Sequence, residues 1–223
     1  MTKTRNEHRG PDREAALAQY RQRAAVYDLE LALFEPIRRL AITRLGLQPG
    51  DTVLDVGSGT GLSLGLLREG VGGAGRVVGI EQSPPMMEQA SERVRQSGWN
   101  NVALSCSPVE SARIAGQADA AFFHFTHDIL LHPEAVSNVV RHLKPGARVV
   151  ASGLKWAPAW AMPANLFVAA AALRSVTSLE GLREPWSQLG NYLGPLDVTL
   201  LWLGSIYIAS GTVVAGRAHG RTR

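Results

Sequence analysis

Three glycines at alternate positions follow a short apolar run and constrain the fold more than any other stretch of the chain. The run covers residues 52–56, the glycines are Gly57, Gly59 and Gly61, and a helical pattern extends through residues 60–70. Glycine permits a tight turn and lets a backbone approach a ligand closely. We therefore expect a buried strand, a glycine turn and a helix, which together open a βαβ unit.

The alternation of strand-like and helix-like segments continues along the chain. Further strands are expected at 76–82, 102–107, 118–125 and 147–153, with helices at 14–31, 34–46, 83–98 and 133–143. Strands that are separated by helices pair in parallel through right-handed crossovers. Two β-rich runs within 197–215 predict a closing antiparallel hairpin. The expected fold is α/β: a doubly wound, mainly parallel seven-stranded sheet with helices on both faces.

Length and composition suit one soluble globular domain. The chain has 223 residues, of which 45% are hydrophobic. We expect the domain over 14–215, between a disordered tail at 1–13 and a basic tail at 216–223. The tails carry much of the net charge of +4, and no basic stripe with interleaved aromatic residues predicts nucleic-acid binding. A single cysteine, Cys106, and an N-terminus without the apolar stretch of a signal peptide favour a cytoplasmic location.

Two acidic residues narrow the ligand that the glycine turn would hold. The dinucleotide fingerprint G-x-G-x-x-G needs a glycine or alanine at position 62, which is Leu62 here. At Asp55 a carboxylate suits a cationic ligand or the amides of the turn better than a pyrophosphate; the alternative is that it only holds the turn. Glu81 ends the second strand, where an acid can accept both hydroxyls of a ribose. The pattern moves the prediction away from a dinucleotide.

Four stretches, in this order and spacing, resemble class I S-adenosylmethionine-dependent methyltransferases: VLDVGSGTG at 53–61, VVGIEQSPPMMEQA at 77–90, ADAAFFHFTHDIL at 118–130 and HLKPGARVV at 142–150. The resemblance covers residues 25–155 well. It implies a Rossmann-like methyltransferase fold, S-adenosyl-L-methionine as the cofactor and methyl transfer as the activity. The glycine turn would line the methionine part of the cofactor, and Glu81 would hold its ribose.

The resemblance also implies the remaining contacts of the cofactor. Gln82 and Met86 would flank the adenine, although Met86 and its neighbour Met87 equally suit ordinary packing. Many members have an acid where this chain has Ser107. Either the Ser107 hydroxyl, which still accepts a hydrogen bond, or Glu110, three residues on, would take over its contact with the adenine. The complete predicted set is Asp55, Gly57, Ser58, Gly59, Thr60, Gly61, Glu81, Gln82, Met86, Ser107, Pro108, Val109, His124, Tyr20 and Tyr27.

The chemistry is expected just past the fourth strand, beside the reactive methyl by analogy with the family. His124, His127 and Asp128 follow that strand. By the same resemblance Tyr27 would reach the methyl donor from the N-terminal segment; the alternative for Tyr20 and Tyr27 is ordinary packing. A histidine can take the proton of a nucleophile near neutral pH. We expect His127 as base or orienting group and His124 nearer the cofactor; the alternative is a hydrogen bond to backbone. These residues and His132 match no zinc spacing, so no metal is expected.

The acceptor is expected to be a small, aromatic or hydrophobic metabolite that is methylated on N, O or C. N-terminal helices at 14–46, with Tyr20 and Tyr27, would cover the cofactor, and an apolar insert at 156–193 would cover the acceptor. Within the insert, residues 159–173 predict a buried helix or an active-site cover rather than a membrane span. The same apolar content would suit a homodimer interface.

Two other function classes remain open at this stage. A phospholipid-amine N-methyltransferase would place the apolar insert against the bilayer surface, which we favour less than a small-molecule acceptor. A non-catalytic nucleotide-binding protein, or a dehydrogenase, would use the same glycine turn. The expected partner is thus a small-molecule acceptor, with no nucleic acid.

Overall fold

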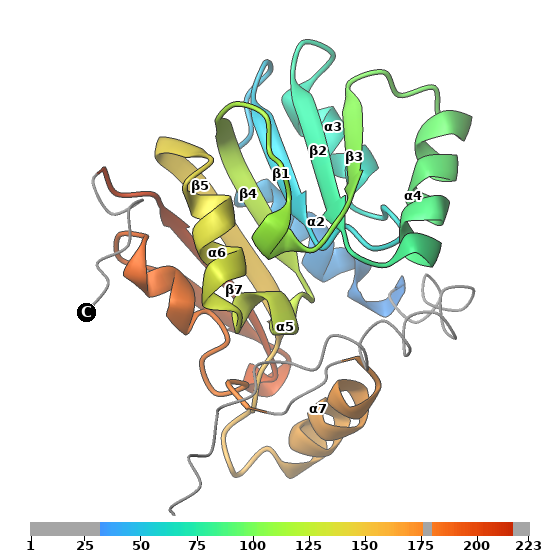
Figure 1. The fold of residues 1–223 in the computed structure, drawn as a ribbon. Helices are drawn as coiled ribbons and strands as arrows, with labels where there is room; N and C mark the ends of the chain where they lie inside the picture. Colours follow the sequence, from blue (N-terminus) through green and yellow to red (C-terminus); the bar gives the residue numbers. More distant parts are fainter. Residues whose placement is uncertain (1–31, 176–179, 216–223) are drawn as a thin grey trace, which may run out of the picture.

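The computed structural model describes residues 32–175 and 180–215. Within these ranges the chain forms one sheet with helices on both of its faces (Figure 1). The helix expected at 14–31, the tails at 1–13 and 216–223, and the candidate site residues Tyr20 and Tyr27 lie outside the described residues.

The sheet has seven strands in the order β3-β2-β1-β4-β5-β7-β6. The five strands β1 to β5 pair in parallel, and β7 runs antiparallel to both β5 and β6. This arrangement confirms the predicted doubly wound sheet with its C-terminal hairpin. The bounds are β1 Thr52–Val56, β2 Arg76–Glu81, β3 Val102–Cys106, β4 Ala118–His124, β5 Leu143–Leu154, β6 Asp197–Leu201 and β7 Ile206–Thr212.

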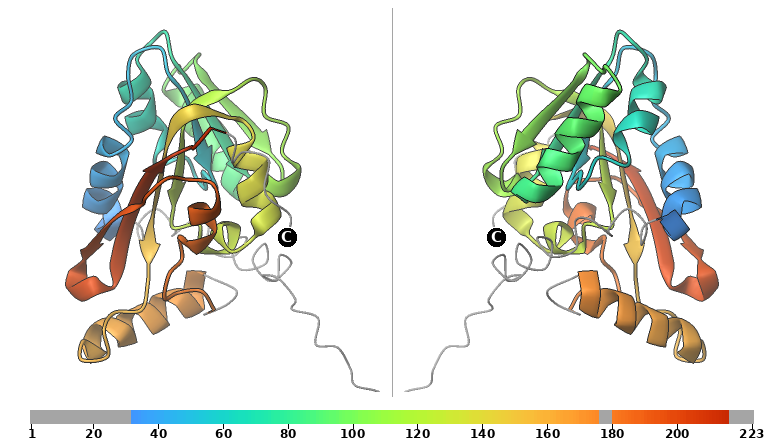
Figure 2. Two further views of the ribbon diagram at one scale, coloured as in Figure 1. Left: turned by 90° about the vertical axis from the view of Figure 1, so that its left-hand side faces the viewer. Right: turned by 90° about the vertical axis from the view of Figure 1, so that its right-hand side faces the viewer.

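Helices lie on both faces of the sheet (Figure 2). A hydrophobic cluster on each face packs them against the strands. Neighbouring strand residues alternate between the two clusters, so that Val53 packs into one cluster and Leu54 into the other. The helices are α2 Glu35–Thr43, α3 Leu64–Val71 and α4 Pro84–Gln96 on one side, α6 Pro133–Val140 on the other, and α5 His127–Leu130 and α7 Met162–Ser175 beyond the strand ends. Single turns are η1 Ala32–Phe34, η2 Val109–Ser111, η3 Ser187–Asn191 and η4 Trp202–Gly204.

Three element boundaries differ from their predicted positions, two of them because of glycines. The helix expected from residue 60 begins at Leu64, because Gly57, Gly59 and Gly61 all have positive φ and keep 57–61 as a turn. The helix expected through 46 ends at Thr43, and Gly46 follows it with a φ of 59°. The fifth strand begins earlier than expected, at Leu143, because this residue pairs with Ala118 of β4.

The apolar insert differs from a buried helix. Helix α7 buries Val168, but Met162 and Leu166 are more than two-thirds exposed, as is Trp160 just before the helix. The helix is apolar on all sides, and this is why its pattern alone predicts burial. In the part of the chain that the structure describes, no helix is long and apolar enough to cross a bilayer.

Candidate active site

A pocket lies at the carboxyl ends of β1, β2 and β4, where a doubly wound sheet binds its ligand. It encloses about 600 Å³ of space that is partly open to solvent. The lining residues come from the glycine turn, the end of β2, the starts of α4 and η2, and the segment after β4. They are Gly57, Gly59, Glu81, Gln82, Met86, Val109, His124, Phe125, Thr126, His127, Asp128 and Ile129.

The glycine turn packs directly against the segment that follows β4. Gly57 has a φ of 72°, and a Cβ atom there would lie 2.5 Å from Thr126 Cγ2 and 2.8 Å from Ile129 Cδ1. The N–H groups of Gly57 and Ser58 donate to the Ile80 carbonyl at 2.8 and 3.0 Å, and so tie the turn to β2. Position 57 therefore requires glycine both for its backbone angle and for the space beside it.

Glu81 holds the wall of the pocket opposite this segment. Its Oε2 accepts the Gly59 N–H at 3.0 Å, and its Oε1 accepts the Ser83 N–H at 2.7 Å. Burial raises the pKa of Glu81, while these backbone donors work against the rise. Each carboxylate oxygen offers about two acceptor sites. The Gln82 N–H is a third backbone donor to this carboxylate. Of about four acceptor sites, one is therefore left over for a ligand hydroxyl, and this fits the role expected of Glu81 toward a ribose.

Asp55 lies behind the turn and does not line the pocket itself. Its side chain is buried, and its Oδ2 has no hydrogen-bond partner in the described part of the chain. Burial raises the pKa of Asp55 to about 7; the Arg38 charge lowers it and the nearby Glu81 raises it further. An orphaned, buried carboxylate oxygen is costly unless a donor or a cation is supplied.

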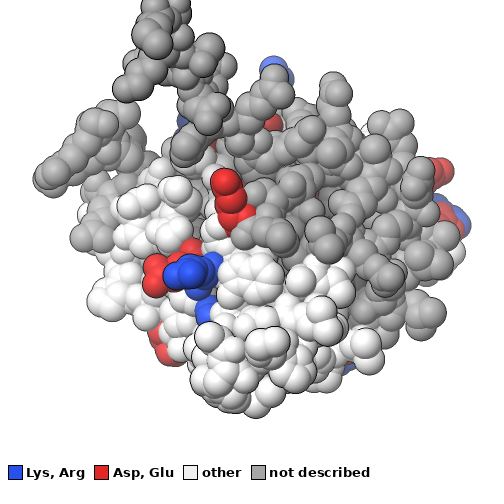
Figure 3. All heavy atoms as spheres, turned by 90° about the horizontal axis from the view of Figure 1, so that it is seen from below, with Lys and Arg blue, Asp and Glu red and all other residues white. Residues whose placement is uncertain are grey.

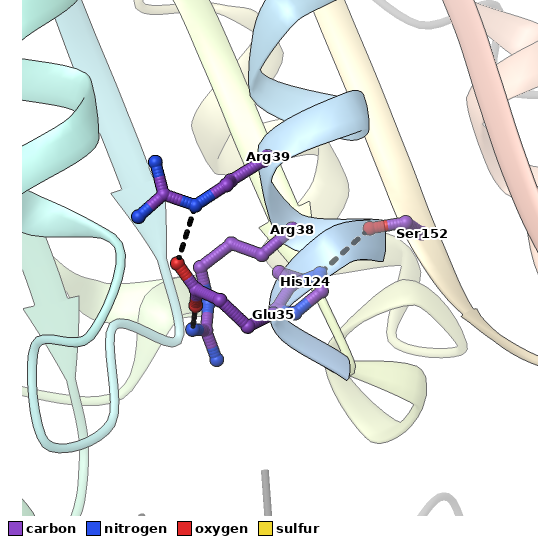
Figure 4. Close-up of polar contacts among 5 residues, drawn as sticks. All are labelled: Glu35, Arg38, Arg39, His124 and Ser152. Carbon is purple, nitrogen blue, oxygen red and sulfur yellow. Dashed lines mark hydrogen bonds and ion pairs between the residues drawn. The ribbon is translucent and has the colours of Figure 1, made fainter. Parts of the chain in front are cut away.

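His124 ends β4 with one ring nitrogen engaged and the other not. Its Nδ1 lies 2.8 Å from the Ser152 hydroxyl of β5 (Figure 4), and its Nε2 is buried with no partner among the described residues. The ring stacks on Phe122 at 5.5 Å and meets the edge of Phe125 at 4.7 Å. Burial, and then the charge of Arg38, hold the pKa of His124 well below its usual range. The imidazole is therefore neutral near pH 7.

His127 opens α5 and is tied to the insert. Its Nε2 lies 2.8 Å from the Glu180 carbonyl, so this nitrogen carries the proton and donates. In the neutral ring Nδ1 then carries a lone pair; this atom is buried and has no partner in the described part of the chain. Burial lowers the pKa of His127, and the Glu180 carbonyl and Asp128 partly oppose that shift. The hydrogen bond to backbone, which is the alternative to a catalytic role for His127, thus occupies only one of its two ring nitrogens.

Several predicted residues lie next to the pocket without lining it: Asp55, Ser58, Thr60, Gly61, Ser107 and Pro108. The Ser107 hydroxyl pairs with that of Ser105 at 3.1 Å, so Ser107 is engaged within β3 and the loop after it. Gly61 packs its Cα side against Leu64 and Ala90 and serves the turn. Among the described residues, no group of three His, Cys, Asp or Glu side chains is placed to hold a metal ion.

The sequence pattern missed four residues at or beside the pocket. Phe125, Thr126 and Ile129 belong to the stretch already singled out, and their contribution depends on how the chain leaves β4: Phe125 has a φ of 56°. Arg38 of α2 acts on both Asp55 and His124 through its charge. It gave no signal, because Glu35, Arg38 and Arg39 suggest the solvated face of a helix.

The chain is similar to methyltransferases in sequence and in fold. Residues 53–146 match the model of a methyltransferase domain. A protein-L-isoaspartate O-methyltransferase of Methanococcus aeolicus is 29% identical over 48% of this chain and 48% of its own length. The aklanonic acid methyltransferase DauC of a Streptomyces species is 28% identical over 57% of this chain and 60% of its own length. The chain spans 34% to 48% of the first three curated relatives it matches.

A solved structure shows the same fold. The N-methyltransferase NodS from Bradyrhizobium japonicum, in complex with S-adenosyl-L-homocysteine, superimposes with a TM-score of 0.66 at 16% identity, over 89% of this chain and 98% of that one. The matching domain model, the glycine turn and the strand order agree with one another. Residues 53–146 are therefore similar to a methyltransferase domain, and the chain shares its fold with a solved S-adenosyl-L-homocysteine-bound methyltransferase.

Proposed function

We propose that the protein transfers a methyl group from S-adenosyl-L-methionine to an N, O or C nucleophile of a small aromatic or hydrophobic molecule, in secondary metabolism. The observation that carries the proposal is that one pocket joins the glycine turn and Glu81 to the neutral His124. The first two suit a donor with a ribose, and the third suits a nucleophile that must lose a proton. The small-molecule relative DauC supports the acceptor class.

The residues present fit the donor in three respects. Glu81 keeps a free acceptor site beside its three backbone donors, Asp55 has an oxygen near the turn with no partner among the described residues, and the space beside Gly57 admits no side chain. When bound, S-adenosylmethionine supplies an already activated methyl carbon. The chain then has to align that carbon with the nucleophile, and positioning alone accounts for much of the rate of such a displacement.

His124 is the better placed of the two histidines to take a proton. Its neutral form persists below pH 6.5, and its Nε2 is the nitrogen not engaged by Ser152. Where the Ser152 hydroxyl accepts the Nδ1 proton, Nε2 carries the lone pair that removes a proton from an N–H or O–H acceptor. His127 and Asp128 line the same pocket and would orient that acceptor.

An aromatic array beside the pocket supports a flat, apolar acceptor. Phe34 packs on Phe125 with ring centroids 4.6 Å apart, and it also meets Trp202 at 5.7 Å and Phe167 at 6.3 Å. Phe125 lines the pocket, whereas Phe167 and Trp202 are partly exposed. The four rings thus run from solvent to the site. Such rings pack well against a flat apolar ligand.

The exposed apolar face favours one second candidate, methylation of a phospholipid amine at the bilayer surface. Five large apolar side chains are largely exposed: Trp160, Met162, Leu166, Trp202 and Leu203. Seen from below, the described atoms of the molecule carry few charges (Figure 3). Tryptophan and aliphatic side chains on one face suit an interfacial contact. Cosedimentation with phosphatidylethanolamine vesicles separates the candidates: retention of the wild type and loss in Trp160→Ser would support the lipid acceptor.

Calorimetry with the donor tests the proposed function. We expect S-adenosylmethionine, and not NAD, to bind. Glu81→Gln should weaken that binding at least 10-fold, about 1.4 kcal/mol, because its amide NH₂ would face a backbone N–H. The matched control is Glu88→Gln on the exposed side of α4, which should bind like the wild type. Binding of NAD instead would overturn the proposal. A product search by mass spectrometry with labelled donor then identifies the acceptor.

A further inference from the structure

Three buried polar atoms in the wall of the pocket have no hydrogen-bond partner among the described residues: His124 Nε2, Thr126 Oγ1 and His127 Nδ1. Their residues lie at the end of β4 and directly after it, and all three line the same cavity as the glycine turn. Buried polar atoms are nearly always paired in folded proteins, because an unpaired one is costly. A ligand that fills this part of the pocket would supply the missing partners.

The insert determines which nitrogen of His127 carries the lone pair. The side chain is 7% exposed, and its Nε2 lies 2.8 Å from the Glu180 carbonyl, which can only accept a hydrogen bond. Nε2 therefore carries the proton. Burial lowers the pKa of His127 and so keeps the ring neutral. Nδ1 is then left as an atom that can only accept a hydrogen bond.

The Glu180 carbonyl is itself held in place by the residues that follow it. Gly181 has a φ of 73°, and a Cβ atom there would lie 2.4 Å from Leu131 Cδ2 at the end of α5. The Leu182 carbonyl accepts the Trp156 N–H at 2.8 Å, which ties the same segment to the chain just after β5. The packing of the insert therefore sets the tautomer of the ring.

The other two unpartnered atoms are less selective toward a ligand. The Thr126 hydroxyl rotates and can donate or accept, and it makes no capping hydrogen bond to α5. His124 Nε2 is the atom that faces the group to be methylated in the proposed function. His127 Nδ1 pairs only with a donor, and an ether or carbonyl oxygen placed against it would leave two buried acceptors facing each other.

We propose that His127 selects acceptors that carry a second O–H or N–H group near the one that is methylated, and that it rejects acceptors in which this second group is an ether or a carbonyl. The inference rests on the proposed function and names its acceptor class more closely: a flat molecule with two neighbouring protic groups. A site that hydrogen-bonds a substrate hydroxyl discriminates strongly against the analogue that lacks it, because a buried polar group is then left unpaired.

Pairs of small phenols that differ by one methyl group test this selection. Catechol is compared with its monomethyl ether, and resorcinol, whose two oxygens lie farther apart, with its own monomethyl ether. Binding is followed by nitrogen NMR of isotope-labelled histidine side chains in the presence of S-adenosyl-L-homocysteine. In at least one pair we expect the diphenol to bind about 10-fold or more tightly than its ether. The diphenol should also shift the Nδ1 resonance of His127, and the ether should not.

Two variants separate the lone pair from the shape of the site. His127→Phe keeps a flat ring and removes the lone pair, so it should reduce the preference for the diphenol below about 3-fold. The matched control is His132→Phe. Its Nδ1 is likewise buried without a partner among the described residues, but the residue does not line the pocket. This control should keep the preference of the wild type.

The wild type alone can overturn the inference. It fails if neither pair shows a preference, if none of the four phenols binds, or if the spectrum of the free protein places the proton of His127 on Nδ1. A preference that persists in His127→Phe also overturns it. If that variant does not fold, the wild-type preference together with the shift of the His127 Nδ1 resonance decides the question. Calorimetry with S-adenosylmethionine judges the proposed function separately, since it requires no acceptor.

Discussion

His124 and His127 lie three residues apart, but their hydrogen-bond partners suit them to different roles. Ser152 engages one nitrogen of His124 and leaves Nε2 in the pocket wall, whereas the Glu180 carbonyl ties His127 to the insert. Both have a lowered pKa because of burial. The neutral ring is therefore the resting form of each, and only His124 adjoins the aromatic array.

This difference predicts the pH profile of the reaction. Because the pKa of His124 lies well below 6.5, the ring stays deprotonated as the pH falls from 8 to 6.5. We expect kcat/KM for a protic acceptor to stay flat over that range and to decrease only at lower pH. His124→Gln should lower kcat about 100-fold or more, as is usual for loss of a general base, and remove the acid limb. Retention of the limb in this variant would assign it to another group.

Asp55 predicts a pH dependence of stability. Its pKa rises from 3.8 in the unfolded chain to about 7 in the fold, so the folded state binds the extra proton between these values. The stability that the protonated form provides is lost as the pH rises from about 4 to about 7, by about 1.4 kcal/mol per unit at most. Asp55→Asn should be more stable than the wild type at pH 8. Urea titrations at pH 5 and 8 measure this difference, and a gap that does not change with pH would contradict it.

At the scale of elements, the glycine turn predicts a contrast between two substitutions. Gly57→Ala places a Cβ 2.5 Å from Thr126, whereas Gly46→Ala, at a similar positive φ, meets nothing within 4 Å. Both variants should lose about 1 kcal/mol from the backbone angle. Gly57→Ala should in addition displace α5 and abolish binding of S-adenosylmethionine. Thermal melts and calorimetry on the pair measure both effects; donor binding by Gly57→Ala would show that the turn does not hold the donor.

The turn between β6 and β7 has a strained backbone and an exposed side chain. Leu203 has a φ of 57° and is 61% exposed, and Trp202 before it also has a positive φ. Leu203→Gly should raise the stability by about 0.5–1 kcal/mol, because glycine adopts this angle freely. Leu200→Gly, at a half-exposed position within β6, should lower it. The urea concentration at the midpoint of unfolding should therefore increase in Leu203→Gly and decrease in Leu200→Gly. A reduced turnover in a stabilised Leu203→Gly would mean that the leucine serves the acceptor.

The sequence predicted where the strands and helices lie better than it predicted which of their side chains are buried or enter the site. Buried strands are continuous apolar runs between glycines, and these runs survive in any context, so β1 to β5 and the closing hairpin could be located. Arg38 could not be recognised, because its burial depends on how α2 packs against β5, which is distant in sequence. Phe125 enters the site through one backbone angle, and α7 exposes apolar side chains that its composition alone would bury.

At the scale of the whole molecule, the proposed function divides the sheet into a donor half and an acceptor half. Strands β1 and β2 with the turn after β1 form the first, and β4 with the aromatic array forms the second. The acceptor side includes η1, α7 and the β6–β7 turn, which are far apart in sequence. Donor specificity and acceptor specificity can therefore change independently: substitutions at Phe34 or Trp202 should alter the acceptor range without altering donor affinity.

The position of β7 bears on how the chain is made. This strand lies between β5 and β6, although β6 comes first along the chain, and its residues Ile206–Gly211 are all buried. On the ribosome β6 emerges before the strand that it pairs with, and the open edge of β5 stays unpaired until residue 212 has cleared the exit tunnel. Such an edge readily pairs with a second nascent chain. Slow translation between residues 201 and 212 should therefore cost yield through misassembly, even though every residue of the pocket has by then been synthesised.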